Sequence, residues 1–141
     1  MQKYHQKFKS YLEKTQSRYT SQKKSLVEAI YKTTTHFEVE DFINVLHKKN
    51  IPFSRATLYR TIKQLLEANL IQKIATQDGK VFYEKASENN IHDHLICNNC
   101  GAIIEIESKQ IHDIITQYCN KNTFSPEYRS LHIYGKCKTC R

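Results

Sequence analysis

Residues 54–66, SRATLYRTIKQLL, predict a helix with two different faces. Ser54 can cap its first turn. The apolar residues recur at helical spacing and form one stripe: Leu58, Ile62, Leu65 and Leu66. The opposite face carries side chains of types that bind bases or phosphates in DNA complexes: Ala56, Thr57, Arg60, Lys63 and Gln64. Such a face is either solvated or bound to a DNA groove, and the flanking residues help to decide between the two.

The residues on both sides of this helix favour DNA binding. Residues 26–31 and 39–46 show the same apolar spacing, so two further helices precede it, and residues 2–14 are compatible with another. Downstream, the β-compatible residues 70–76 and 81–84 flank an Asp-Gly turn, which predicts a hairpin. Three helices and a two-stranded ribbon within about 70 residues outline a winged helix-turn-helix.

The positive charge of the chain is concentrated in its first part. The 22 Lys and Arg residues exceed the 14 Asp and Glu residues, which gives a formal net charge of +8. Residues 1–85 hold 16 basic and 8 acidic side chains, whereas residues 86–141 hold 6 of each. A basic module with Lys80 in its predicted wing indicates that the first part binds double-stranded DNA.

The apolar residues are too dispersed for a membrane protein. No uninterrupted apolar run exceeds three residues, whereas a membrane-spanning helix needs about 20. The basic N-terminus has no apolar segment behind it that would make it a secretory signal. We therefore expect a cytoplasmic protein with no membrane partner.

Two cysteine pairs predict a structural zinc site. Cys97 and Cys100 form one Cys-x-x-Cys pair, and Cys137 and Cys140 form the other. Two disulfides are the rival interpretation, but they are disfavoured in a reducing compartment. Four thiolates leave no open coordination position, so the site would be structural and not catalytic. The fifth cysteine, Cys119, has the helical spacing of a buried apolar residue.

A second candidate metal site starts at His92-Asp93-His94. Both imidazoles lie on one face of the predicted strand, and Glu105 and Glu84 are candidate carboxylate ligands. Imidazole and carboxylate ligands suit Fe(II), Mn(II), Co(II) or Zn(II). If His36 and Glu84 join the two histidines, the ion would link two domains and fix their relative orientation.

These assignments divide the chain into three parts. Residues 1–84 form the predicted winged helix, the polar residues 85–91 a hinge, and residues 92–141 a second domain. The second domain is expected to have short strands at residues 92–97, 102–106 and 130–134. One helix near residues 109–121 is expected to bury Ile111, Ile114, Ile115 and Tyr118. So small a domain needs stabilisation by metal binding and dimerisation.

Several motifs extend over almost the whole chain: Thr20-x-Gln22-Lys23, His36, Ser54-x-Ala56-Thr57-Leu58-Tyr59-Arg60, His92-Asp93-His94-Leu95-Ile96-Cys97-x-x-Cys100-Gly101 and Leu131-His132-Ile133-Tyr134-Gly135-x-Cys137-x-x-Cys140. Together they resemble the ferric uptake regulator family of metal-responsive transcription factors. The resemblance implies an α+β chain in which an N-terminal winged helix-turn-helix precedes a small C-terminal α/β dimerisation domain with the four-cysteine zinc site. It also implies a homodimer that binds a palindromic operator and represses transcription when the regulatory metal is bound.

The resemblance also assigns roles to individual residues. By position, the regulatory metal ligands are His36, Glu84, His92, His94 and Glu105. Tyr59 and Arg60 match the residues that contact the operator. The family pattern implies neither an enzyme nor a small-molecule substrate. A metalloenzyme and a zinc-ribbon interaction module without metal sensing remain as competing classes.

The sequence departs from the family pattern at several positions. Lys23 stands where Arg is usual, which keeps the charge but loses the planar fork. Arg129 and Ile91 stand where some members carry histidines of a second regulatory site, so we expect no complete second site. The glutamate at position 105 resembles the residue of the iron-responsive branch, because the peroxide-sensing branch typically has Asp at this position. We therefore expect Fe(2+), or Mn(2+), as the regulatory cofactor, with a peroxide-sensing repressor as the alternative.

Overall fold

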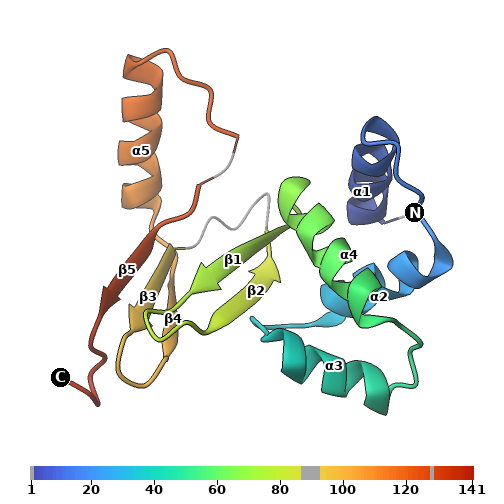
Figure 1. Cartoon of the computed structure of the whole chain (residues 1–141). Coiled ribbons are helices and arrows are strands. Elements are labelled where there is room, and N and C mark those ends of the chain that lie inside the picture. Colours follow the sequence, from blue (N-terminus) through green and yellow to red (C-terminus); the bar gives the residue numbers. More distant parts are fainter. Residues whose placement is uncertain (1, 87–92, 128) are drawn as a thin grey trace. The chain divides into compact units, whose positions relative to one another are not determined.

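The computed structural model describes residues 2–86, 93–127 and 129–141 (Figure 1). Helices dominate the first part of the chain and strands the second, so the predicted α+β fold class is confirmed. The elements follow in the order α1 (Lys3–Lys14), α2 (Ser21–Lys32), α3 (Val39–Lys48), α4 (Arg55–Glu67), β1 (Ile71–Ala75), β2 (Val81–Lys85), β3 (Asp93–Cys97), β4 (Ile103–Ile106), α5 (Lys109–Lys121) and β5 (His132–Gly135).

The chain divides into two compact units. The first comprises Met1–Ala75 and Lys80–Ala86, and the second comprises Thr76–Gly79 and Ser87–Arg141. Of the predicted hinge, residues 87–91 lie outside the described residues, as does His92. No described helix combines the length and the apolar composition that crossing a bilayer requires.

The core of the first unit is formed by the apolar stripes of its helices. Leu26 and Ile30 of α2, Leu46 of α3, and Leu58 and Leu65 of α4 are completely buried there. The side chain of Ser54 accepts a hydrogen bond from the backbone N–H of Thr57 and so caps α4 as expected. Burial of one stripe leaves the opposite face of α4 outside the core.

The N-terminal helix α1 packs against the same core. Phe8 and Leu12 are almost completely buried. The ring of Tyr4 stacks on Tyr31 of α2 with 3.8 Å between ring centroids. The Tyr11 hydroxyl donates a hydrogen bond to Glu67 at the end of α4. α1 is therefore an integral part of the first unit.

The predicted hairpin forms the wing. β1 and β2 pair antiparallel, with Ile71 opposite Lys85 and Ala75 opposite Val81. Gly79 has a φ of +86°, a conformation in which a side chain would be strained, and this explains the glycine at the turn. β2 continues to Lys85, one residue beyond the expected strand.

The second unit contains a three-stranded sheet in the order β4-β3-β5. β3 is antiparallel to β4 and parallel to β5, and α5 lies between β4 and β5 in the chain. The central strand β3 is the most buried element, because Asp93, His94, Ile96 and Cys97 are each at most 4% exposed. The residues expected to bind metal thus lie on and around the central strand.

The expected burial of α5 is wrong for the single chain. No residue of α5 is buried, and Ile114 and Tyr118 are 53% and 64% exposed. Ile111 and Ile115 are only partly buried. Three strands of four or five residues offer too small a surface to cover a helix of 13 residues. Part of the apolar face of α5 therefore remains uncovered in the monomer.

Candidate functional site

The outer face of α4 divides into two adjacent polar stripes. The outer stripe consists of Ala56, Tyr59 and Lys63, all exposed. The pocket stripe borders a pocket beside α4 and consists of Thr57, Arg60 and Gln64, of which Thr57 and Gln64 are partly buried. The side-chain amide of Gln64 donates to the Ser17 hydroxyl at 3.3 Å, and Thr57 accepts from Ser54 at 2.8 Å. Lys80, the residue before β2, is also exposed.

The four cysteines of the two Cys-x-x-Cys pairs come together in the second unit. Their sulfur atoms all lie within 4.8 Å of one another, and Cys100 Sγ is 3.7 Å from Cys137 Sγ. Tetrahedral coordination with metal–sulfur bonds of about 2.3 Å requires sulfur atoms about 3.8 Å apart. The arrangement therefore fits a four-coordinate ion such as zinc. Cys119 lies on α5 and is not part of this group.

The surroundings of the cluster favour thiolates. The backbone N–H groups of Cys100 and Cys137 lower the pKa of Cys97 to about 6, and the second of these donates to the Cys97 sulfur at 3.3 Å. Hydrogen bonds from Cys140 likewise lower the pKa of Cys137, so thiolates are favoured at Cys97 and Cys137. At Cys100 the backbone of Ala102 lowers the pKa, but the other three cysteine side chains together outweigh it and raise this pKa to about 11. Thiolates so close together repel one another unless a cation lies between them.

The second unit also brings together His94 and Glu105. They are directly opposite each other on β3 and β4, and their candidate ligand atoms lie within 4.8 Å of one another. His94 is 1% exposed, whereas Glu105 is exposed. A nearly buried imidazole beside a carboxylate is a suitable pair of ligands for a divalent cation.

The first unit contains the other two described residues of the predicted regulatory set. Phe37 and Tyr83 form a short antiparallel bridge, and His36 and Glu84 are the neighbouring residues in these two segments. The His36 ring packs edge-on against Phe82 at 5.1 Å. Glu84 is 5% exposed and accepts a hydrogen bond from the amide of Gln72. The fifth predicted ligand, His92, lies outside the described residues.

Two further residues next to His94 were not assigned to this site from the sequence. His132 of β5 is opposite His94, and their rings meet edge-on at 5.3 Å. Arg129 donates to the buried Asp93 at 3.0 Å. The position of His132 follows only from the parallel pairing of β3 with β5, which no local pattern predicts.

Comparison with known proteins identifies the family. The model of the ferric uptake regulator family matches residues 14–134. The chain belongs to the ferric uptake regulator family. It is 31% identical to the ferric uptake regulation protein of Campylobacter upsaliensis over 138 residues, covering 96% of this chain and 87% of that protein.

Solved structures of family members have the same fold. The ferric uptake regulator of Helicobacter pylori, described as having three functional metal-binding sites, aligns with a TM-score of 0.71 at 25% identity, covering 94% of this chain and 87% of that one. The Francisella tularensis regulator, solved with iron, aligns with a TM-score of 0.66 at 28% identity, covering 88% of this chain and 94% of that one.

The family establishes the general function. The chain is a metal-responsive, DNA-binding transcriptional regulator, and it is not an enzyme. The metalloenzyme alternative is therefore wrong. Membership also argues against a zinc-ribbon module without metal sensing.

We expect Cys97→Ser to reduce the tightly bound metal by one ion per chain, because three thiolates and a hydroxyl hold the ion far more weakly. Metal content measured by elemental analysis after dialysis against a chelator tests this. Cys119→Ser, which removes the cysteine outside the cluster, should keep the full metal content. Equal metal content in Cys97→Ser and wild type would contradict the assignment.

Proposed function

We propose that this chain is an Fe(II)-dependent repressor that binds palindromic operators as a homodimer when its regulatory metal is bound. The observation that carries the proposal is the pair of His94 and Glu105, a nearly buried imidazole opposite a carboxylate on neighbouring strands. The regulatory ion takes its ligands from this pair, from His92, and from His36 and Glu84 of the first unit.

The ligand types support different ions at the two metal sites. Four thiolates favour zinc as the structural ion, whereas imidazole and carboxylate ligands suit Fe(II) or Mn(II). Iron is favoured by the name of the Campylobacter upsaliensis relative and by the iron in the Francisella tularensis structure. Glu105 adds support, since the resemblance associates glutamate at this position with the iron-responsive branch.

The ligands contribute to DNA binding by restricting the relative orientations of the two units. When bound, the ion supplies a positive centre that attracts side chains from both units. His36 and Glu84 belong to the unit that carries α4, and His94 and Glu105 belong to the unit that carries α5. Holding these residues together limits the orientations of α4 and lowers the entropic cost of docking it in the major groove. This activity on DNA would take place in the cytoplasm.

The exposed apolar side chains of the second unit support a homodimer. Its exposed apolar side chains come from β4, α5, the segment after α5, and β5: Ile104, Ile114, Tyr118, Phe124, Ile133 and Tyr134. A second copy would cover the apolar stripe of α5 and supply apolar contacts that the sheet lacks. A twofold-symmetric dimer presents two α4 helices, and this symmetry is what a palindromic operator requires.

A charge on the apolar stripe of α5 should separate the protomers. We expect Ile114→Glu to convert the dimer to a monomer, because burying an unpaired carboxylate costs several kcal/mol. Light scattering coupled to gel filtration measures the mass. Asn120→Glu, which adds the same charge on the opposite face of α5, should stay dimeric. A dimer of Ile114→Glu with unchanged stability would contradict this interface.

Metal-dependent DNA binding tests the proposed function directly. The metal-loaded wild type selects an operator from a random duplex pool, and its affinity is then measured with Fe(II), with Mn(II) and with chelator under anaerobic conditions. We expect affinity to rise with Fe(II) and to fall with chelator, while the structural zinc stays bound. Operator affinity that is independent of every added ion would refute the proposal.

His94→Ala separates the regulatory site from the structural one. We expect it to retain zinc and the dimer but to lose activation of operator binding by Fe(II), because it removes a ligand from the central strand. Loss of activation should be at least about tenfold in affinity, the effect of about 1.4 kcal/mol. His112→Ala, which removes an exposed imidazole of α5 that belongs to neither group of candidate ligands, serves as the control.

A peroxide-sensing repressor is the second candidate function, because it uses the same ligands. In that case iron bound beside an imidazole would direct oxidation of a ligand histidine, with peroxide as the oxidant. We expect the Fe(II) form of the wild type to resist low peroxide and Glu105→Asp to become sensitive. Mass spectrometry after brief exposure decides: one added oxygen atom on His36 or His92 of the wild type would favour the peroxide sensor.

A further inference from the structure

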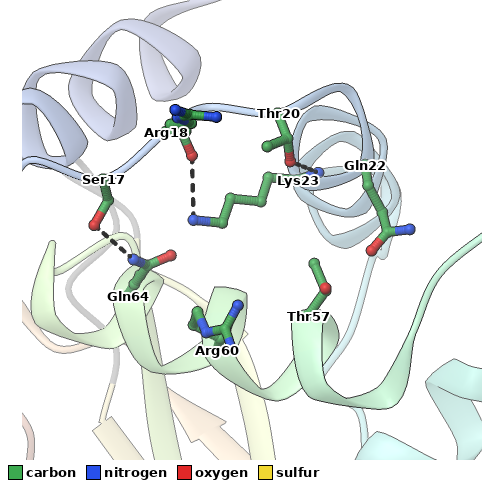
Figure 2. Close-up of a pocket in the computed structure, with 8 residues that line it drawn as sticks. All are labelled: Ser17, Arg18, Thr20, Gln22, Lys23, Thr57, Arg60 and Gln64. Atoms are coloured by element: carbon green, nitrogen blue, oxygen red, sulfur yellow. Dashed lines mark hydrogen bonds between the residues drawn. The ribbon is translucent and has the colours of Figure 1, made fainter.

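A polar pocket lies beside α4 in the first unit. Figure 2 shows it between the segment that leads into α2 and the pocket stripe of α4. Its volume is about 500 Å³. The lining residues are Ser17, Arg18, Thr20, Gln22, Lys23, Thr57, Arg60 and Gln64. They include three basic side chains, and none of the eight carries a carboxylate.

The most unusual residue of the pocket is Lys23, a lysine that is only 7% exposed. Its Nζ donates to the backbone carbonyl of Arg18 at 3.2 Å, as drawn in Figure 2. An ammonium group has three N–H donors, so this bond leaves further donors for another acceptor. Burial, and to a smaller extent the nearby cation of Arg60, lower the pKa of Lys23.

Two neighbouring cations with no carboxylate among the lining residues make a surface that favours an anion. Burying an ammonium group beside a guanidinium costs free energy, and an anion between them would offset this cost. The pocket also lies at the start of α2, where the backbone N–H groups and the helix dipole attract negative charge. Thr20 caps this end, accepting from the backbone N–H of Lys23 at 3.3 Å.

The position of the pocket relative to α4 indicates which anion it takes. Thr57, Arg60 and Gln64 line the pocket, while Ala56, Tyr59 and Lys63 form the adjacent outer stripe. If the outer stripe contacts bases, the side of the helix next to it faces the sugar–phosphate backbone that borders the groove. A cationic pocket in that place is suited to a phosphodiester.

We propose that this pocket binds one backbone phosphate of a DNA duplex, held by Lys23 and Arg60 at the start of α2, and thereby positions α4 in the groove. The proposal rests on the proposed DNA-binding function and extends it to Lys23, which lies on α2 and not on α4. Lys23 contributes equally to operator and unrelated DNA, because every duplex presents the same phosphates. Its burial also fixes the ammonium in place before DNA arrives.

The test compares Lys23→Met with Lys32→Met, which removes the same charge at the exposed far end of α2. Affinity of the Fe(II)-loaded proteins is measured for the selected operator and for a scrambled duplex, between about 50 and 200 mM KCl. We expect Lys23→Met to lose roughly tenfold in affinity for both duplexes and to reduce the salt slope by about one. Lys32→Met should change both quantities far less.

Thermal unfolding of the free proteins separates this role from a structural one. Lys23→Met should melt at or above the wild-type temperature, because it removes a buried charge that has a cationic neighbour. A lower melting temperature together with normal DNA affinity would show that Lys23 only stabilises the fold. A loss confined to the operator would show that Lys23 recognises a base, and this would also overturn the proposal.

Inorganic phosphate shows whether the pocket binds a DNA backbone phosphate or a free anion. It also separates failure of the pocket proposal from failure of the proposed function. Its effect on melting is measured against chloride at equal ionic strength. Suppose that Lys23→Met binds both duplexes like Lys32→Met, and that phosphate raises the melting temperature of the wild type but not that of Lys23→Met. The pocket would then be a site for free anions, and the DNA-backbone proposal would be wrong. If the wild type binds no duplex with any ion, the proposed function fails. In that case, a rise in melting temperature with phosphate that is lost in Lys23→Met would still support an anion site in the pocket. If phosphate has no such effect, the anion site is refuted as well.

Discussion

Attraction between a cation and the groups arranged to bind it would supply the stability that the second unit lacks, because this unit has too few buried apolar residues to be stable through them alone. Among its described residues, the buried apolar side chains are Ile96 and Cys97, both on β3. Asp93 and His94 on the same strand are buried although they are polar. Removing these groups from water is costly unless they are paired or bound to an ion. Arg129 pairs with Asp93, and a bound cation would act in the same way on the cluster of four sulfur atoms.

The first unit is stabilised in a different way, and the contrast suits a regulator. Its helices bury a continuous apolar core that includes Phe8, Leu26 and Leu65 and needs no ion. The outer face of α4 would therefore keep its shape whether or not a metal is bound. In the proposed function, metal binding changes how this preformed face is held and does not create it.

Residues 54–66 and the hairpin after them could be predicted because the helical period, the Ser54 cap and the Asp-Gly turn are local signals. The four-cysteine cluster could be predicted because its spacing is specific to one chemistry. The exposure of α5 could not be predicted, because an apolar helix face does not indicate whether the residues that cover it belong to the same chain or to another. Lys23 could not be recognised as buried, since its burial depends on how α2 packs beside α4. The neighbour of His94 on β5 likewise depends on a pairing between distant segments.

The parallel pairing of β3 with β5 affects how the second unit unfolds. Cys97 ends β3, and Cys137 follows β5 by two residues, so an ion bound to both pairs closes a loop that contains β4, α5 and β5. Closing such a loop removes much of the conformational freedom that unfolding would otherwise gain. None of these elements can separate fully from the chain while the ion holds both pairs. With such an ion bound, the lifetime of the folded unit would depend on release of the ion as well as on the packing of its strands.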